Sequence, residues 1–265
     1  DLHSFPTRRS SDLTKAFVGL LAAKLDEKGV LKLDSTLADH WPDLKLPEGL
    51  EAKDWTLREV LSHQLPITAN EIAGTEAYVT RLNPADYPAL LARYAKKREP
   101  GFKYSNLGYN IYSAILHKAT GKTWEEWLAK ELLAPMALKK TATRTSAANA
   151  DDLTWGHLWL GAEKQWHEVA PKPDPLMHAA GGMISTPKEL AAWLQMQLKQ
   201  QGPRGSGFDK NLFVTAHTPY AQVDPKAKNA IELPCDGYAL GWNVCDFDGK
   251  RLYVHGGGYT GTATM

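Results

Sequence analysis

The sequence predicts a fold of mixed α and β structure, with helices through most of the chain and strands gathered toward its end. Apolar residues recur at spacings of three and four between residues 14 and 199, which is typical of amphipathic helices. Residues 238–255 instead show two extended segments around an Asp-Phe-Asp-Gly turn. Because strands and helices do not alternate, we expect no parallel sheet built from βαβ units.

The helices are placed by this periodicity and by the residues that stop it. In the first helix, Phe17, Leu20, Leu21 and Leu25 share one face, and Gly29 ends the run. Further helices are expected at 56–63, 84–97, 106–120, 123–133 and 187–199.

Capping residues support three of these helices. Thr56 and Glu59 have the spacing of a capping box, and Pro187 stands in the first turn of its helix. Gly121 has the position of a residue that ends a helix. These residues therefore predict two helix starts and one helix end.

The strands are expected mainly as two hairpins. Residues 155–160 are paired with 165–169 around a polar turn, and residues 238–245 with 251–255. A short extended stretch is expected at 31–33.

Composition is that of an ordinary globular protein and excludes several classes. The 31 basic and 30 acidic residues give a net charge of +1, which argues against a nucleic-acid partner. No apolar run reaches the roughly 18 residues that a membrane-spanning helix needs. The chain holds neither a His-Glu-x-x-His nor a Cys-x-x-Cys motif, so we expect no metal site, and we expect no cofactor.

The remaining histidines and cysteines are interpreted as structural. His63, His178 and His217 are expected in the core or in loops. Cys235 and Cys245 are too few for a disulfide scaffold and are expected as free thiols, with a pair as the alternative if the chain is exported.

Residues 1–13 (DLHSFPTRRSSDL) are interpreted as foreign to the gene. They lack the apolar region of a signal peptide. Their back-translation resembles a widely used short-read sequencing adapter, which places the start of the native sequence at about Thr14. The alternative is a natural disordered tail. Under the adapter interpretation, the segment is left out of the fold prediction.

Three short motifs carry the candidate chemistry. Residues 14–17 (TKAF) begin the first helix, 100–106 (PGFKYSN) lead into the fourth, and 255–258 (HGGG) follow the last expected strand. In this order they resemble the serine β-lactamase and penicillin-binding-protein superfamily, most of all class C β-lactamases and the related esterases and D-amino-acid peptidases. Further stretches that match the family are 56–63, 120–122, 134–138 and 180–186.

The resemblance covers nearly all of residues 14–265 and implies the fold. It implies an antiparallel sheet flanked by helices, a mostly helical region at about 51–213, and a cleft between the two. In this family both ends of the chain meet in the sheet, so we expect a domain that is incomplete at both ends. Unpaired strand edges at 238–256 then predict an inactive chain that is prone to aggregation. A periplasmic or secreted location is implied by the family alone.

The first motif of the family is Ser-x-x-Lys, in which the serine is the nucleophile. A spacing of three places both side chains on one helix face, and a lysine whose pKa is lowered by burial can take the serine proton. Lys15 matches this lysine, but Asp12 occupies the nucleophile position. Ser11 lies about 100° further round the helix and is no substitute. We therefore expect the nucleophile to be missing and Asp12 to pair with Lys15.

The second motif supplies a tyrosine and an amide. Tyr104 matches the family's candidate general base, a role that needs a nearby cation because a phenol titrates near about 10. The alternative is a core tyrosine. Asn106 matches the amide that binds substrate and orients Lys15, and its alternative is a helix cap.

The third motif lines the opposite wall of the cleft. His255, Gly256 and Gly257 match its substrate-binding strand, and the Gly258 N–H would form half of an oxyanion hole with the N–H of residue 12. Histidine in place of the usual lysine favours an esterase or peptidase over a strict β-lactamase. A glycine-rich loop with a solvated histidine is the alternative. The oxyanion motif of α/β-hydrolases is similar, but in that fold it precedes a Gly-x-Ser-x-Gly elbow and lies much nearer the start of the chain than residue 255. An α/β-hydrolase is therefore rejected.

The expected function is therefore a serine hydrolase that acts through an acyl-enzyme on an amide or ester. The substrate, a small molecule or peptide, would be a β-lactam, a D-Ala-D-Ala-type peptide or a short-chain ester. The alternative is a non-catalytic binding or sensor module that kept the cleft. Retention of Lys15, Tyr104 and Asn106 argues against that alternative, and the oligomeric state stays open.

Overall fold

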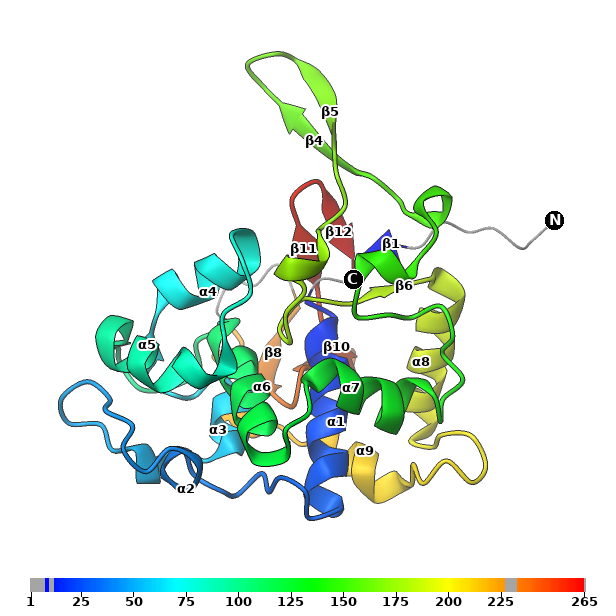
Figure 1. The fold of residues 1–265 in the computed structure, drawn as a ribbon. Helices are drawn as coiled ribbons and strands as arrows, with labels where there is room; N and C mark the ends of the chain where they lie inside the picture. Colours follow the sequence, from blue (N-terminus) through cyan, green and yellow to red (C-terminus); the bar gives the residue numbers. More distant parts are fainter. Residues whose placement is uncertain (1–7, 10–11, 227–232, 265) are drawn as a thin grey trace.

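The structure is a computed structural model that describes residues 8–9, 12–226 and 233–264 (Figure 1). It has mixed α and β structure, as the sequence predicts. The helices are α1 (Thr14–Glu27), α2 (Leu37–His40), α3 (Leu57–Leu61), α4 (Asn70–Tyr78), α5 (Tyr87–Tyr94), α6 (Leu107–Thr120), α7 (Trp124–Leu128), α8 (Pro187–Lys199) and α9 (Lys210–His217).

The strands form small antiparallel sheets. They are β1 (Arg8–Arg9), β2 (Ile67–Thr68), β3 (Lys96–Lys97), β4 (Gly156–Leu160), β5 (Gln165–Val169), β6 (Ile184–Ser185), β7 (Ala221–Gln222), β8 (Cys235–Tyr238), β9 (Asn243–Phe247), β10 (Lys250–Val254), β11 (Gly257–Tyr259) and β12 (Thr262–Thr264). The largest sheet has the order β10-β9-β8-β7, and the other described strands pair two by two.

Helix α1 lies at the centre of the molecule, as Figure 1 shows. Every residue from Thr14 to Leu25 is buried, because the helix is covered on all sides. Phe17 stacks on Trp193 of α8, with ring centroids 3.8 Å apart. The helix that carries the first motif is therefore held rigidly by the core.

The turn between β8 and β9 packs directly on α1. A Cβ atom at Gly19 would lie only 2.1 Å from the Leu240 carbonyl oxygen, so the helix and the turn can approach this closely only with glycine there. Gly241, at φ +85°, packs in the same way on the Lys15 carbonyl. This contact fixes the largest sheet against the start of α1.

Helix α6 is the second buried helix near the site. Gly108 lets its first turn lie against the Val60 carbonyl of α3, where a Cβ atom would be 2.2 Å from the oxygen. Gly121 ends the helix in the left-handed conformation, as predicted. The second motif therefore leads into a helix whose first turn packs closely on α3.

Several predicted boundaries are wrong. The helix expected at 84–97 ends at Tyr94, because residues 96–97 pair with β2 as strand β3. The α-helix expected at 123–133 ends at Leu128 and continues as a π-helical turn, Ala129–Leu133. Residues 31–33 form no strand, and helices α2, α4 and α9 were not predicted.

The last predicted hairpin also needs correction. Residues 238–245 are not one strand: β8 ends at Tyr238, the tight turn on α1 follows, and β9 begins at Asn243. The turn between β9 and β10 is the two-residue Asp248-Gly249, with both residues at positive φ. Among the described residues, β10 pairs only with β9.

The expectation of free thiols is wrong. Cys235 and Cys245 stand directly opposite each other in β8 and β9 and form a disulfide. Antiparallel pairing brings the two side chains to the same place, which the sequence separation of 10 does not reveal. Ser10 and Ser11, with most of the segment interpreted as foreign, lie outside the described residues.

Candidate active site

The centre of the candidate site is Lys15, in the first turn of α1. Its side chain is fully buried, and its Nζ donates to Asp12 Oδ1 at 2.6 Å, Asn106 Oδ1 at 2.8 Å and the Ala180 carbonyl at 2.8 Å. These three acceptors use all three protons of the ammonium group. Burial lowers the pKa of Lys15 from its ordinary value, and the charge of Asp12 opposes that shift.

Asp12 joins the first motif to the third. One carboxylate oxygen accepts from Lys15, and the other accepts from the Gly258 N–H at 3.3 Å. Burial alone would raise the pKa of this carboxyl, but Lys15, the Gly258 N–H and His255 together lower it. The pairing of Asp12 with Lys15 is as expected from the spacing of three.

Tyr104 lies beside the lysine. Its ring centroid is 4.7 Å from Lys15 Nζ. Desolvation of the hydroxyl, then the charge of Asp12 and a hydrogen bond to it, raise the pKa of Tyr104 well above its ordinary value. With Asp12 present, Tyr104 therefore stays protonated near neutral pH.

Asn106 occupies the N-cap position of α6 but does not cap the helix. Its side chain makes no capping hydrogen bond and accepts from Lys15 instead, while Ser105 Oγ accepts from the Leu107 N–H. The amide is thus oriented by the lysine rather than by its own helix.

His255 is buried behind the site and is not solvated. Only 4% of it is exposed, its Nδ1 lies 2.6 Å from the Gly256 carbonyl, and its Nε2 lies 3.2 Å from Tyr238 Oη. Because a carbonyl only accepts, Nδ1 carries the proton and Nε2 accepts from Tyr238. Burial and the charge of Lys15 lower the pKa of His255 to about 4, so the imidazole is neutral at pH 7.

The glycines of the third motif lie close to Asp12. Gly256 links β10 to β11, and Gly257 and Gly258 begin β11, which pairs with β12. Of the three, Gly258 makes a described contact with Asp12 through its backbone N–H. The structure therefore brings all three motifs to one place around the Asp12 carboxylate.

Sequence reasoning missed an aromatic cluster behind Tyr104. His63, expected as a core or loop histidine, is buried at a positive φ of 63°. Its ring lies 4.8 Å from that of Tyr104 and 4.7 Å from that of Tyr238. Neither Tyr238 nor the Ala180 carbonyl was assigned to the site, because nothing in a linear sequence marks a buried hydroxyl or a backbone acceptor.

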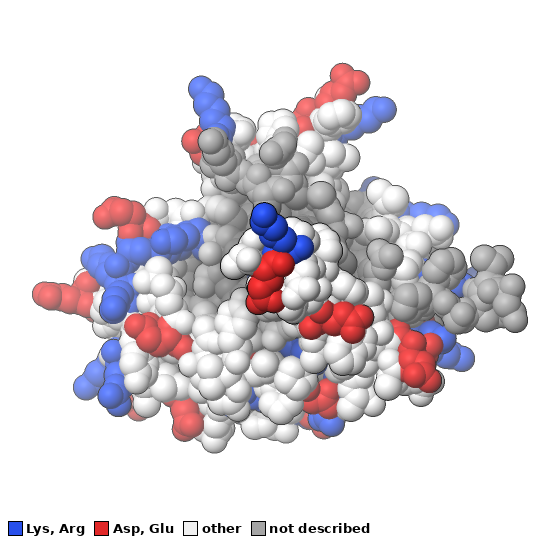
Figure 2. All heavy atoms as spheres, turned by 90° about the horizontal axis from the view of Figure 1, so that it is seen from above, with Lys and Arg blue, Asp and Glu red and all other residues white. Residues whose placement is uncertain are grey.

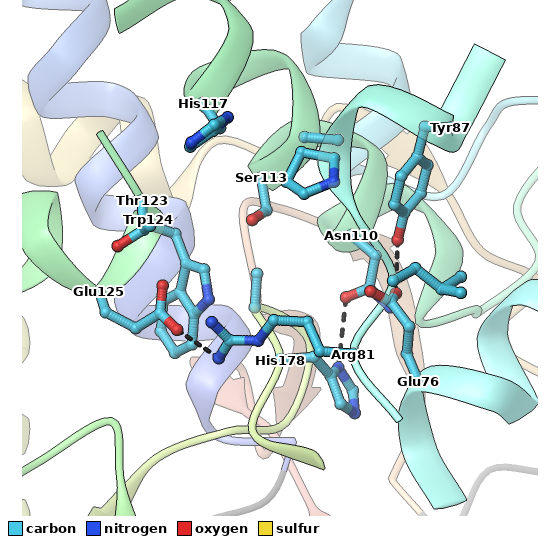
Figure 3. A pocket seen from close by; sticks show the side chains of 14 residues that line it. Glu76, Arg81, Tyr87, Asn110, Ser113, His117, Thr123, Trp124, Glu125 and His178 are labelled. Carbon is cyan, nitrogen blue, oxygen red and sulfur yellow. Dashed lines mark hydrogen bonds and ion pairs between the residues drawn. The ribbon is translucent and has the colours of Figure 1, made fainter. Parts of the chain in front are cut away.

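A small cavity lies between α4, α6 and α7, apart from the Asp12–Lys15 pair (Figure 3). At about 50 Å³ it has room for a few water molecules. At its wall Asn110 Oδ1 lies 3.2 Å from His178 Nδ1, and Arg81 donates to the Met177 carbonyl at 2.7 Å. These bonds hold the segment that presents the Ala180 carbonyl to Lys15.

Charges are mixed over the face that Figure 2 shows. Lys and Arg side chains alternate there with Asp and Glu, without a continuous basic area. Within the described residues, no helix is long and apolar enough to cross a bilayer, and no group of three or more His, Cys, Asp or Glu residues could hold a metal ion.

The fold and the meeting of the three motifs define a protein of the β-lactamase and transpeptidase type. A family model described as Beta-lactamase matches residues 12–265. The chain therefore belongs to the β-lactamase family, within the serine β-lactamase and penicillin-binding-protein superfamily.

Solved structures have the same fold. A D-stereospecific amidohydrolase from Streptomyces sp. superposes with a TM-score of 0.75 at 21% identity, covering 98% of this chain and 77% of that chain. D-amino acid amidase from Ochrobactrum anthropi SV3 superposes with a TM-score of 0.73 at 22% identity, covering 96% of this chain and 70% of that chain.

Curated relatives are longer than this chain. Unguisins hydrolase ungD' of Aspergillus campestris is 24% identical over 89% of this chain, and penicillin-binding protein 4 of Amycolatopsis lactamdurans is 25% identical over 94%. The chain spans 42% and 65% of the length of these two relatives.

Proposed function

We propose that this domain is built as a serine hydrolase of the class C β-lactamase type that cleaves an amide or ester through an acyl-enzyme. The observation that carries the proposal is the double contact of residue 12. Its side chain meets the buried Lys15 ammonium on one side and the Gly258 N–H on the other. A nucleophile at this position needs a neighbouring group that accepts its proton, and the tetrahedral adduct needs a hydrogen-bond donor for its negatively charged oxygen. The two contacts of residue 12 are with one group of each kind.

With serine at position 12, the reaction proceeds in two steps. The hydroxyl gives its proton to neutral Lys15 or to the Tyr104 phenolate while its oxygen attacks the substrate carbonyl, and the carbonyl oxygen takes the negative charge beside the Gly258 N–H. The carbon–nitrogen or carbon–oxygen bond then breaks, and the leaving group receives the proton. Water attacks the resulting ester in the same way, which releases the acid and restores the serine.

The Asp12 carboxylate blocks this chemistry in the present chain. It cannot form an acyl-enzyme that turns over normally. Its charge also opposes the lowering of the Lys15 pKa by burial, and it raises the pKa of Tyr104. In the same proposal Asp12 belongs to a foreign segment, and the natural gene has a serine codon three before Lys15. Sequencing of the source DNA across the Thr14 junction tests this point, and a natural reading frame with aspartate would contradict it.

The neutral His255 supports a substrate that needs no cation at this wall. Both ring nitrogens are taken by Gly256 and Tyr238, and the pKa of about 4 leaves the ring uncharged. A short-chain ester or a peptide-like amide fits these contacts better than a β-lactam whose carboxylate seeks a positive charge. The similarity to D-amino acid amidases supports an amide.

A non-catalytic binding module is the second candidate, and the Asp12–Lys15 ion pair favours it. If aspartate is native, the cleft keeps its donors but has no nucleophile. The module would then bind an acyl compound without cleaving it.

The Asp12→Ser variant tests the two candidates. The variant should gain one adduct from a fluorophosphonate or penicillin probe, seen by intact mass and mapped to residue 12, and should hydrolyse p-nitrophenyl acetate. Asp12→Ala also loses the ion pair but offers no oxygen, and Asp12→Ser with Lys15→Met keeps the oxygen without the base. Neither control should be labelled. If folded Asp12→Ser stays unlabelled, the hydrolase proposal is wrong.

A further inference from the structure

Helix α6 and its N-cap residue carry two asparagines one helical turn apart. Asn106 and Asn110 are four residues apart, which places their side chains on one face, and Asn106 Oδ1 accepts from Lys15 Nζ at 2.8 Å. Asn110 is buried, and its Oδ1 lies 3.2 Å from His178 Nδ1, as the dashed line in Figure 3 shows. The first amide therefore contacts the lysine directly, and the second contacts a histidine two residues before Ala180.

His178 begins the turn that contains Ala180. The Gly181 N–H donates to the His178 carbonyl at 2.9 Å, which closes a four-residue turn with Ala180 at its third position. The Ala180 carbonyl accepts from Lys15 Nζ at 2.8 Å. Gly182 packs on the same turn, where a Cβ atom would lie 2.4 Å from the His178 backbone nitrogen. The His178 side chain therefore belongs to the same tight unit as this acceptor of the lysine.

His178 holds this turn without adding a charge. Burial lowers the pKa of His178 well below its ordinary 6.5, and the nearby cations Lys172, Lys15 and Arg81 lower it further. The ring is therefore neutral at pH 7, and because the Asn110 oxygen only accepts, Nδ1 carries the proton. Replacing this ring by another neutral side chain leaves the charge of the site unchanged at that pH.

The two acceptors outside residue 12 decide where the lysine base points. A neutral lysine amine has two N–H donors and one lone pair. In an Asp12→Ser chain, Asn106 Oδ1 and the Ala180 carbonyl take the two donors, so the lone pair lies in the remaining direction, that of residue 12. A displaced Ala180 carbonyl would leave the lone pair free to turn away from the nucleophile.

We propose that Asn110 and His178 are positioning residues for the lysine base, because their hydrogen bond fixes the Ala180 carbonyl to the helix that carries Asn106. One helix face thus sets both acceptors, one directly and the other through the histidine. Arg81 and Lys172 hold the flanking carbonyls of Met177 and Gly181, but neither belongs to α6. This inference rests on the proposed function, in which Lys15 takes the proton of a serine at position 12.

Breaking the bond has two consequences of opposite sense. The lone pair loses its aim, so proton transfer becomes slower. The protonated lysine also loses an acceptor, and because hydrogen bonds to charged groups are the stronger ones, its pKa falls. The chain then holds more neutral lysine at a given pH and is still the slower enzyme.

The test uses the Asp12→Ser chain and breaks the bond from either side with His178→Phe or Asn110→Leu. Both kcat and KM for p-nitrophenyl acetate are measured across pH 5 to 10, per active site counted with a fluorophosphonate. Each variant should lower kcat about tenfold with KM little changed, a small part of the worth of a general base. The acidic limb of kcat/KM should move about one unit to lower pH, as expected for the loss of one hydrogen bond to a charged group. The double variant should be no worse than either single variant, since both break the same bond.

The limb can be assigned to Lys15 because the other titratable groups around it titrate outside the range between 6.5 and 10. Burial lowers the pKa values of three nearby histidines below 6.5 and raises those of two nearby tyrosines above 10. These groups are His63, His178 and His255, and Tyr104 and Tyr109.

Two controls separate positioning from folding. His178→Asn has an amide nitrogen that can donate from about the place of Nδ1, and it should keep most of kcat and the original limb. His217→Phe is the matched control, because His217 is also buried, its pKa is lowered to about 4, and its Nε2 lies 2.9 Å from Gln197 Oε1. Neither His217 nor Gln197 holds an acceptor of Lys15. His217→Phe should lower the Tm but leave kcat per site and the limb unchanged.

A role in folding alone would change the amount of active protein and not its kcat per site or its limb. If the Asp12→Ser chain hydrolyses the ester and folded His178→Phe and Asn110→Leu keep both values, the positioning role is wrong and the hydrolase proposal stands. If His178→Phe does not fold, Asn110→Leu decides the question by the same two values. If the Asp12→Ser chain is neither labelled nor active, the hydrolase proposal fails and the positioning role with it.

Discussion

Asp12→Asn removes the negative charge from a buried ion pair and leaves the Lys15 ammonium in place. At 2.6 Å, and with an effective dielectric constant of about 20, the gross attraction is about 6 kcal/mol. Removing one partner of a buried pair typically costs about 3 to 5 kcal/mol. The Asp12 side chain is 22% exposed, and Lys15 keeps Asn106 and the Ala180 carbonyl as acceptors. We therefore expect the variant to lose about 2 to 3 kcal/mol of unfolding free energy at neutral pH.

The loss of unfolding free energy in Asp12→Asn should be smaller at both low and high pH than at neutral pH. Folding lowers the pKa of Asp12 below its ordinary 3.8, so its contribution is present above that value and disappears as the pH falls through the folded pKa. The folded pKa of Lys15 lies below 10.5, and Asp12 is one of the groups that raise it. Lys15 of the variant therefore loses its proton at a lower pH, which relieves the unpaired charge and closes the gap as the pH rises.

Urea unfolding of both chains between pH 3 and pH 10 measures this difference. Asp236→Asn is the control, because Asp236 pairs with Arg251 at the same distance of 2.6 Å but the two side chains are 53% and 45% exposed. The control should cost less than about 1 kcal/mol. A difference for Asp12→Asn below about 0.5 kcal/mol, or one that does not change with pH, would refute the electrostatic reasoning.

Three further changes test the fold. Gly108→Ala should lower the free energy of unfolding in urea by at least about 1 to 3 kcal/mol, because the new Cβ would lie 2.2 Å from a carbonyl oxygen of α3. The control is Gly74→Ala on α4, where no atom lies near the new Cβ, and it should be neutral or stabilising. Replacing Cys235 and Cys245 together by Ala should cost about 2 to 3 kcal/mol, and an equal Tm before and after reduction of the original chain would contradict this. Thr123→Ala, which removes a capping box, should cost about 1 kcal/mol, and no change in melting would contradict the cap.

The elements predicted well are those in which local signals and tertiary packing agree. Helix α1 combines a clear apolar period with a glycine stop, and α3 begins with the predicted capping box of Thr56 and Glu59. Helix α4 shows little amphipathic pattern and is held by tertiary contacts of residues such as Ile72 and Glu76. The break after Tyr238 depends on a turn that packs against a helix more than 200 residues earlier, which no local pattern reveals.

The candidate site divides in the same way. Lys15, Asn106 and Gly258 could be named because their motifs have fixed spacing, and the structure brings them together. The neutral state of His255 could not be predicted from the sequence. It depends on burial and on the hydroxyl of Tyr238, which comes from another strand. Motifs identify side chains, whereas charge states depend on what surrounds them.

Asp12 reports the electrostatic field at the nucleophile position. A carboxyl in a largely buried place should titrate above its ordinary pKa, because a charge is poorly solvated there. Its pKa is lowered instead, so Lys15 and the Gly258 N–H together outweigh the loss of water. A place that favours negative charge on oxygen to this degree also favours the charge that develops when a serine at position 12 attacks a carbonyl, since catalysis stabilises the transition state rather than the substrate. The same contacts that make aspartate stable here would therefore make serine reactive.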